Sequence, residues 1–365
     1  MRMTMIGLGN LMEVIWPIIS RTVGGDDVAD RVIGVTADAD DAERKRAVFG
    51  FDVVIDDNLG ALRRNRPDII LFAPPPTVAP GLIEAVLRPY FDERRTEGGP
   101  LPDLYAFPPL PAGSTYLEAL GDDVLVANII PNNVTSIGGR PVVDEGHYVC
   151  TYPAPWPPER IAVLQGLFDG QGAYVHLEPD QLLEFLGGAC AISCLWKIVP
   201  LVADLLAETG APVPHGEIGE YLRGQLRALT AFVPSDSTPV RPDFVPAHAE
   251  FLAAIATAWH RGVTDYFAGT TLAADAAGVL VERGFDLTLH TCQAESREVL
   301  DELAVGAATK GGLLERAIRS VHEDLMPVLR AGVDGPPDDG WVERLASAVG
   351  RTAEIVRLHG ATLAG

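Results

Sequence analysis

The chain opens with a short apolar strand that runs directly into a glycine turn, and this start constrains how the first part of the chain can fold. Residues 3–6 are apolar or small, and Gly7-Leu8-Gly9-Asn10-Leu11 comes before a helical pattern. In such a turn the first glycine permits a tight bend, and the second lets a pyrophosphate approach the backbone closely. The helix after the turn offers its first N–H groups to the phosphates. The sequence therefore predicts a dinucleotide site on Gly7, Gly9, Asn10 and Leu11.

One position of the usual pattern is changed. Met12 stands where a third glycine normally lets the helix pack closely against its strand. A Gly-x-Gly pair also occurs in ordinary strand-to-helix turns, so a purely structural loop stays open as an alternative.

Strands and helices alternate through the first half of the chain. Residues 31–36, 51–55, 68–73, 104–107, 124–130 and 174–177 read as strands, and residues 13–23, 38–49, 59–64, 81–90, 116–120 and 158–168 as helices. The strands are continuously apolar, which is typical of a parallel sheet covered on both faces. We expect Pro17 in or near the first turn of its helix. The polar stretch 93–103 is expected to be a surface insertion.

From residue 178 onward the pattern changes to long helices without strands. We therefore predict an α/β fold with two domains: a Rossmann-type doubly wound domain over residues 1–177, and an all-helical domain over residues 178–365. Residues 233–246 read as a loop between helices, and residues 341–359 as the last helix.

The charge and cysteine content restrict the kinds of partner that this protein can bind. Twenty-eight basic and 50 acidic residues give a net charge of −22, which disfavours nucleic acid and anionic membranes. The four cysteines form no disulfide framework and no zinc spacing, and we expect buried thiols. The apolar run 190–206 is too short and too charged to span a bilayer. No secretory signal precedes the first strand, so we expect a cytoplasmic protein.

Three stretches in order resemble the pyrroline-5-carboxylate reductase family. They are the opening IGLGN, residues 126–133 (VANIIPNN) and residues 305–314 (VGAATKGGLL). The resemblance implies an NAD(P)H-dependent reductase in which Asn132 lies at the nicotinamide-ribose end of the cofactor. It also implies helical domains that interlock in a homodimer, with a substrate site between one subunit's cofactor domain and both helical domains.

The departures from that family concentrate where the substrate should bind. Residues 187–193 (GGACAIS) stand in place of a Ser-Gly-Ser-Gly turn, Leu313 and Leu314 replace paired threonines, and Lys310 replaces a proline. Losing donors for a small carboxylate removes the basis for selecting that substrate. We therefore expect reduction of a C=N group, in an imine or imino acid other than pyrroline-5-carboxylate.

Lys197 lies in an apolar stretch and is a candidate proton donor. An unpaired buried ammonium is costly and its pKa falls, which suits general acid chemistry. Its spacing from residues 188–193 also resembles β-hydroxyacid dehydrogenases, although Leu201 stands where that family has an asparagine. The alternative is a lysine that extends from the helix edge to solvent.

The remaining candidates line the expected substrate pocket. Asn132 follows a strand-ending proline at the carboxyl edge of the sheet, where such folds bind ligands. Thr309 is a candidate catalytic residue or a helix cap. Substrate contacts are expected from Asn132, Ser193, Lys310, Gly311 and Gly312.

Cofactor choice depends on the end of the second strand. Asp38 would bind the adenosine ribose and favour NAD, whereas Thr36 with Arg44 or Arg46 would hold the 2′-phosphate of NADP. The sequence leaves this undecided. Ala73 and Pro74, which end the strand 68–73, are also expected to contact the cofactor.

Other chemistries have little support. The eight histidines form no ligand spacing, so we predict no metal, and there is no nucleophile elbow of a serine hydrolase. Two alternatives to an imine reductase remain: a β-hydroxyacid-dehydrogenase-like enzyme acting on alcohols or C=O groups, and a non-catalytic protein that binds dinucleotide.

Overall fold

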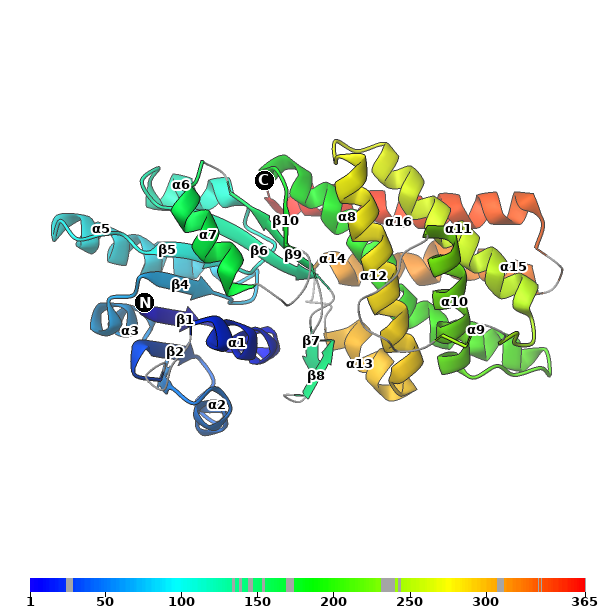
Figure 1. Ribbon diagram of the computed structural model, residues 1–365, viewed down its shortest axis with the longest axis horizontal. Coiled ribbons are helices and arrows are strands. Elements are labelled where there is room, and N and C mark those ends of the chain that lie inside the picture. The colour runs from blue at the N-terminus through cyan, green and yellow to red at the C-terminus, as the bar shows by residue number, and fades with distance from the viewer. Residues whose placement is uncertain are drawn as a thin grey trace. The chain divides into compact units, whose positions relative to one another are not determined.

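Figure 1 shows a computed structural model of the chain. Contacts divide it into a sheet unit, Met1–Pro179, and a helical unit, Asp180–Leu363; the predicted boundary followed residue 177. The residues that the structure describes are 1–23, 29–132, 135–137, 140–143, 147–152, 155–168, 174–230, 240–241, 244–306, 312–333, 335 and 337–364.

The sheet unit is built on eight strands in the order β10-β9-β6-β5-β4-β1-β2-β3. Their bounds are β1 (Met3–Ile6), β2 (Val32–Thr36), β3 (Asp52–Ile55), β4 (Ile69–Phe72), β5 (Asp103–Ala106), β6 (Val126–Asn132), β9 (His147–Thr151) and β10 (Tyr174–His176). Within the run β3-β2-β1-β4-β5-β6, each strand is parallel to the next. The order β3-β2-β1-β4-β5-β6 is that of the doubly wound dinucleotide-binding fold.

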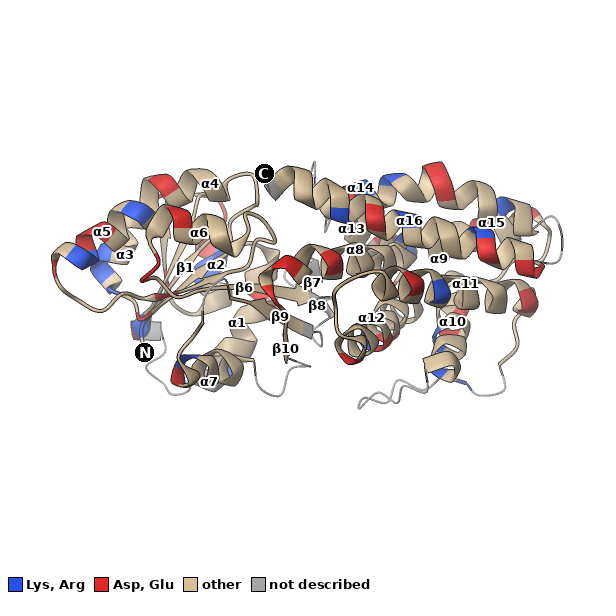
Figure 2. Ribbon diagram, turned by 90° about the horizontal axis from the view of Figure 1, so that it is seen from above, with Lys and Arg blue, Asp and Glu red and all other residues tan. Residues whose placement is uncertain are grey.

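Helices cover both faces of this sheet. They are α1 (Asn10–Val23), α2 (Ala42–Phe49), α3 (Asn58–Asn65), α4 (Ala79–Leu82), a π-helical turn (Ile83–Leu87), α5 (Arg88–Thr96), α6 (Gly113–Leu120) and α7 (Pro158–Leu167). In β4, Ile69 and Leu71 pack in the core with α1, α2 and α7, whereas Ile70 and Phe72 pack with α3 to α6. Figure 2 shows α1 and α7 on one side of the sheet and α4 and α6 on the other. The predicted α/β fold class is confirmed.

The prediction missed three strands and one change of direction. β9 pairs antiparallel with β6, and a hairpin of β7 (Thr135–Ile137) and β8 (Arg140–Val143) precedes it. The sheet is therefore mixed at one side, not wholly parallel. β7 and β8 hold only three and four residues, and glycines stand between the missed strands in the sequence, so this stretch lacks the continuous apolar runs that identified the others.

Two local expectations were also wrong. Pro17 lies well inside α1, because the helix already begins at Asn10; the side chain is exposed, where water can satisfy the carbonyl that loses its partner. The stretch 93–103 is only partly an insertion, since α5 continues to Thr96 and Asp103 begins β5 with 2% of its surface exposed.

The helical unit holds only helices in its described part, as predicted. They are α8 (Leu182–Ser193), α9 (Leu195–Glu208), α10 (His215–Thr230), α11 (Ala249–Ala268), α12 (Ala274–Ala294), α13 (Arg297–Gly306), α14 (Leu313–Ser320), α15 (Met326–Val333) and α16 (Asp339–Ala364). A π-helical turn, Val321–Leu325, joins α14 to α15, and residues 233–239 of the predicted loop lie outside the described residues.

One helical stretch, Pro179–Glu208, is long and apolar enough to cross a membrane by length and composition alone. The run 190–206 was expected to be too short and too charged to span a bilayer, and that expectation does not extend to the longer stretch Pro179–Glu208. Within the helical unit 72% of its apolar window is buried, and a core helix passes the same test of length and composition. That no membrane binds the protein stays a prediction.

Candidate functional site

The chain reverses its direction of winding between β1 and β4. From β1 the sheet extends through β2 to β3 on one side, and the chain then returns to β4 and builds outward on the other side. Ligands of such sheets bind at this switch point, outside the carboxyl ends of the strands. The predicted glycine turn lies there, since it comes directly after β1.

Gly7 has a backbone geometry that requires glycine. Its φ is +90°, a region that side-chain-bearing residues rarely adopt. A Cβ at this position would lie 2.6 Å from the carbonyl oxygen of Ala73, and the Gly7 N–H donates to the carbonyl of Val35 at 3.2 Å. The turn is therefore held between the end of β2 and the segment that follows β4.

Gly9 keeps its side of the loop open. A Cβ built there would meet no atom of the described residues within 4 Å. The Gly9 carbonyl accepts from the N–H groups of Met12 and Glu13, which starts α1. Met12 is fully buried among core side chains, so this helix packs on the sheet with a methionine in place of the third glycine.

An acidic side chain lies in the first turn of α1 and is neutralised by an arginine. Glu13 is 1% exposed at its side chain, and its Oε1 accepts from Arg44 Nη2 at 2.6 Å. Arg44 also donates to Asp41 and lowers the pKa of that carboxyl to about 2. This pairing offsets a negative charge that would otherwise repel an anion at the start of α1.

At the end of β2 the structure brings together Thr36, which was predicted to contact the cofactor, and Lys45, which was not. Lys45 Nζ donates to Thr36 Oγ1 at 3.2 Å and lies 3.3 Å from Asp41 Oδ2. Thr36 and Lys45 are 4% and 8% exposed. Lys45 is nine positions after Thr36 and lies on α2, so only the fold reveals the contact.

The other charged side chains predicted at the end of β2 already have hydrogen-bond partners within the protein. Arg44 binds Glu13 and Asp41, and Arg46 Nη2 donates to the carbonyl of Val53 at 2.6 Å. Asp38 Oδ1 accepts from two backbone N–H groups of the turn before α2. Lys45 is thus the cation placed against the Thr36 hydroxyl.

On the other side of Gly7 from β2, the strand β4 leads to Ala73 and Pro74. The Ala73 N–H donates to the Ile6 carbonyl at 2.8 Å, which holds this segment against the end of β1. Pro74 is buried and Ala73 is half-buried. The structure therefore brings these two predicted residues beside Gly7.

The strand β6 carries a polar side chain that sequence reasoning overlooked. Asn128 is fully buried, and neither atom of its side-chain amide has a hydrogen-bond partner among the described residues. It pairs in register with Ala106, the last residue of β5, near the carboxyl edge of the sheet. A buried amide without partners is costly, so a water or a ligand group is expected there. The predicted Asn132 pairs with His147 at the end of β6; its side chain lies outside the described residues.

In the helical unit, Lys197 lies in an ion-pair network rather than in an apolar pocket. Its Nζ lies 2.7 Å from Asp301 Oδ1 on α13, and its side chain is 25% exposed. Arg297 lies 3.8 Å from the other oxygen of Asp301 and also binds Asp204. The ammonium is therefore paired and partly exposed, which agrees with the alternative of a lysine that extends to solvent and not with an unpaired buried ammonium. Its role as a proton donor stays a prediction.

The small residues of α8 are occupied by packing. A Cβ on Gly188 would lie 2.5 Å from Cε2 of Phe267, and one on Gly187 would lie 2.7 Å from the Ala353 carbonyl. Tyr266 also packs at Gly187 and donates to the Glu184 carbonyl at 2.8 Å. The glycines here admit the aromatic side chains of α11.

The second predicted substrate block is described only at its end. Gly312 is the residue before α14, and Leu313 is buried. Ser193 ends α8 and is half-buried. Thr309, Lys310 and Gly311 lie outside the described residues.

The cysteines match the expected thiols. Cys150, Cys194 and Cys292 are buried, Cys190 is half-buried, and all four are free. Burial raises the pKa of the Cys190 thiol to about 12. No cluster of three or more His, Cys, Asp or Glu side chains suits a metal within the part of the chain that the structure describes.

The sequence matches no protein-family model and no curated protein. Solved structures with a similar course of the chain include a pyrroline-5-carboxylate reductase from Coxiella burnetii, at 15% identity and a TM-score of 0.40, covering 97% of this chain and 98% of that one. A prephenate dehydrogenase from Aquifex aeolicus in complex with hydroxyphenyl propionate and NAD+ has 10% identity and a TM-score of 0.42, over 90% and 98%. A D-mandelate dehydrogenase with NADH has 11% identity and a TM-score of 0.44, over 97% and 99%. Similarities this distant assign no family, and the family resemblance of the sequence stays a prediction.

Proposed function

We propose that this protein is an NAD(P)-dependent oxidoreductase that binds its dinucleotide across the crevice between β1 and β4. The observation that carries the proposal is the glycine turn at the switch point of the sheet. Gly7 has no room for a Cβ and Gly9 has open space, and α1 begins directly after them. A turn of this kind, in a sheet of this strand order, is suited to a pyrophosphate.

The residues around the crevice suit the two ends of such a molecule. The start of α1 would hold the pyrophosphate, and Thr36 with Lys45 would face the adenosine ribose. Ala73 and Pro74 would contact the middle of the cofactor, and Asn128 and Asn132 on β6 would face its nicotinamide end. When bound, the nicotinamide supplies a hydride; the protein would bind and orient the two reactants and exclude water.

The choice between NAD and NADP would depend on Lys45. An ammonium held against Thr36 is a ligand for a 2′-phosphate, although Asp41 competes for it. Replacement of Lys45 by Gln should weaken NADPH binding at least tenfold and leave NADH binding within about twofold, a difference of about 1 kcal/mol. Equal loss for both cofactors would assign Lys45 to folding instead.

For the substrate we propose reduction of a C=N group in a molecule other than pyrroline-5-carboxylate. The support lies in what occupies the helical unit. Aromatic rings fill the space at Gly187 and Gly188, and Leu313 is buried where the resembled family has a threonine. Among the described positions of these blocks, Ser193 is the one hydroxyl donor left for a small carboxylate. We also propose a homodimer through the apolar helical unit, which light scattering would test.

The experiment has two stages. Thermal unfolding with NADH and with NADPH should show a rise in Tm for at least one of them, since a ligand of the native state stabilises it. The protein saturated with that cofactor is then mixed with cyclic imines, imino acids and 2-keto acids, and oxidation of the nicotinamide is followed by its absorbance. Absence of any Tm rise would contradict dinucleotide binding. A Tm rise without turnover on any class would favour the non-catalytic alternative.

Lys197 distinguishes the imine reductase from the β-hydroxyacid type. If Lys197 is the general acid of an alcohol dehydrogenase, replacement by Ala abolishes alcohol oxidation and preserves cofactor affinity. The matched control is Asp301→Asn, which removes the partner 2.7 Å away and keeps the lysine. If Lys197 only holds α9 to α13, both variants should show the same modest loss of stability and keep similar activity.

A further inference from the structure

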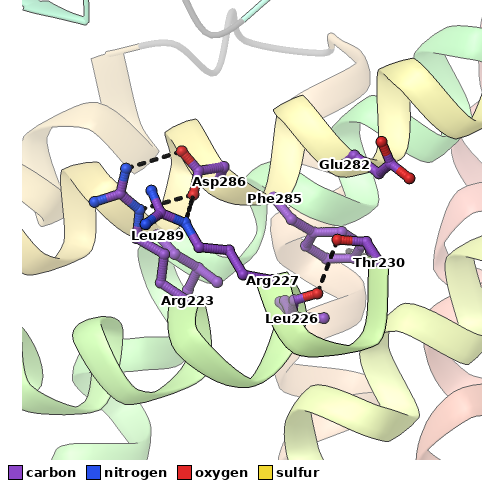
Figure 3. A pocket seen from close by; sticks show the side chains of 8 residues that line it. All are labelled: Arg223, Leu226, Arg227, Thr230, Glu282, Phe285, Asp286 and Leu289. Atoms are coloured by element: carbon purple, nitrogen blue, oxygen red, sulfur yellow. Dashed lines mark hydrogen bonds and ion pairs between the residues drawn. The ribbon is translucent and has the colours of Figure 1, made fainter. Parts of the chain in front are cut away.

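Two arginines of α10 converge on one buried carboxylate of α12 (Figure 3). Arg223 is 1% exposed, and its Nε and Nη2 donate to the two oxygens of Asp286 at 2.9 and 2.8 Å. This fork-to-fork pair satisfies both oxygens of Asp286. One arginine and one aspartate are therefore already matched in charge and geometry.

Arg227 adds a second cation to this matched pair. Its Nε donates to Asp286 Oδ1 at 2.6 Å, and its side chain is 21% exposed. Its Nη2 is buried and has no hydrogen-bond partner among the described residues. A buried guanidinium N–H without an acceptor is costly, so this atom requires an acceptor that the described residues do not supply.

The pair of arginines borders a small cavity between α10 and α12. Its volume is about 10 Å³, room for one water-sized group. The walls are Arg223, Leu226, Arg227, Thr230, Glu282, Phe285, Asp286 and Leu289. Figure 3 shows the Glu282 carboxylate directed away from both guanidinium groups, so it does not supply the missing acceptor.

We propose that this cavity binds the carboxylate of a small organic acid, with Arg227 Nη2 as donor to one carboxylate oxygen. One oxygen fits the volume, and the exposed edge of Arg227 leaves a path for the rest of the molecule. A phosphate or sulfate has more oxygens than one buried donor and a volume of about 10 Å³ accommodate. All residues of this binding site belong to the helical unit, whereas those that carry the proposed dinucleotide site belong to the sheet unit.

The direct test is a calorimetric titration of the full-length protein with sodium formate in chloride-free buffer. We expect saturable binding with a dissociation constant on the order of 1 mM, near the limit for so small a ligand. Formamide, which has the same shape without the charge, should not bind. The variant Arg227→Gln should lose at least tenfold in affinity, and Arg330→Gln, an equal change of charge at an exposed position of α15, should lose none.

A second measurement guards against misfolded variants and against a purely structural role. In buffer without formate or chloride, Arg227→Gln should unfold at nearly the temperature of the native chain, because Asp286 keeps both hydrogen bonds from Arg223. Arg223→Gln should unfold at a lower temperature, because it strips Asp286 of its buried partner. Formate should raise the Tm of the native chain and not that of Arg227→Gln. If Arg227→Gln lowers the Tm as much as Arg223→Gln does, or if chloride binds and formate does not, the proposal is overturned.

Discussion

Glycines occupy both regions of this chain that were expected to meet ligands, and they act in opposite ways. At Gly9, in the loop after β1, no atom of the described residues lies within 4 Å of where a Cβ would be, so the backbone is open to an approaching group. At Gly188, in α8 of the helical unit, that same position lies 2.5 Å from Cε2 of Phe267. There the protein's own aromatic ring occupies the space.

The difference teaches that a glycine in a sequence permits close approach without saying what will approach. At the start of the chain, the described residues leave the space at Gly9 open. In α8 the neighbouring helix α11 takes the space with Tyr266 and Phe267. Three glycine substitutions and one pH dependence would break or sharpen the comparison of the two units, from the largest expected effect on folding to the smallest.

The largest effect is expected from Gly7→Ala. The new Cβ would meet the Ala73 carbonyl oxygen at 2.6 Å, and the residue would keep a φ of +90°. Strain and overpacking together should lower the free energy of unfolding by about 4 kcal/mol. Urea denaturation followed by circular dichroism would measure it, and a change below about 1 kcal/mol would show that the turn is adaptable.

Gly188→Ala should cost about 2–3 kcal/mol, because the ring of Phe267 cannot move aside as a flexible chain can. The double variant with Phe267→Leu should recover part of that loss. The matched control is Gly278→Ala on α12, where a Cβ would meet no described atom within 4 Å. There alanine should stabilise the helix by about 1 kcal/mol. Equal Tm changes at Gly188 and Gly278 would refute the packing role.

The pH dependence should separate the two units, because their buried aspartates shift in opposite directions. Burial raises the pKa of Asp103 in β5 to about 6, with Arg160 opposing. Burial also acts to raise the pKa of Asp286, but the hydrogen bonds from Arg223 and Arg227 outweigh it and the pKa is lowered.

The sheet unit should therefore lose stability as the pH rises from about 4 to about 6, by about 2 kcal/mol, since its native state binds the Asp103 proton more tightly. Asp286 contributes stability above its unfolded-state pKa and loses it only as the pH falls below about 4. Denaturation across this range should show the slope in the native chain and not in Asp103→Asn. A slope that persists in the variant would assign it to other groups.

The smallest effect on folding is expected from Gly9→Ala. The space is open and the position needs no positive φ, so the free energy of unfolding should change by less than about 0.5 kcal/mol. The methyl group would occupy the approach of a pyrophosphate, and cofactor affinity should fall at least tenfold by calorimetry. Unchanged affinity would remove Gly9 from the proposed cofactor site.

Much of the sheet unit could be predicted because its information is local. The strands β1, β2 and β4 are continuous apolar runs, and the glycine turn comes after one of them without interruption. β9 was missed because its antiparallel pairing with β6 is a long-range choice that no short window of sequence encodes. The helices of the second unit could be recognised from composition, but which helices pack against one another could not.

The site residues show the same division. The loop positions Gly7 and Gly9 could be assigned from the turn itself. The contact of Lys45 with Thr36 depends on how α2 lies on the sheet, and Lys197 meets Asp301 across 104 positions of the sequence. Such pairings arise from tertiary packing, which patterns of residue type within one segment do not specify.

The fit of Phe267 against Gly188 has a consequence for the history of the sequence. A side chain cannot be added at residue 188 while the ring is in place, whereas a smaller residue at 267 leaves a cavity that a later change at 188 can fill. In a descendant of this chain, the phenyl ring at residue 267 must therefore be replaced by a smaller side chain before Gly188 can be replaced by a larger one. In relatives, any residue larger than glycine at the position of Gly188 should occur together with a smaller one at the position of Phe267.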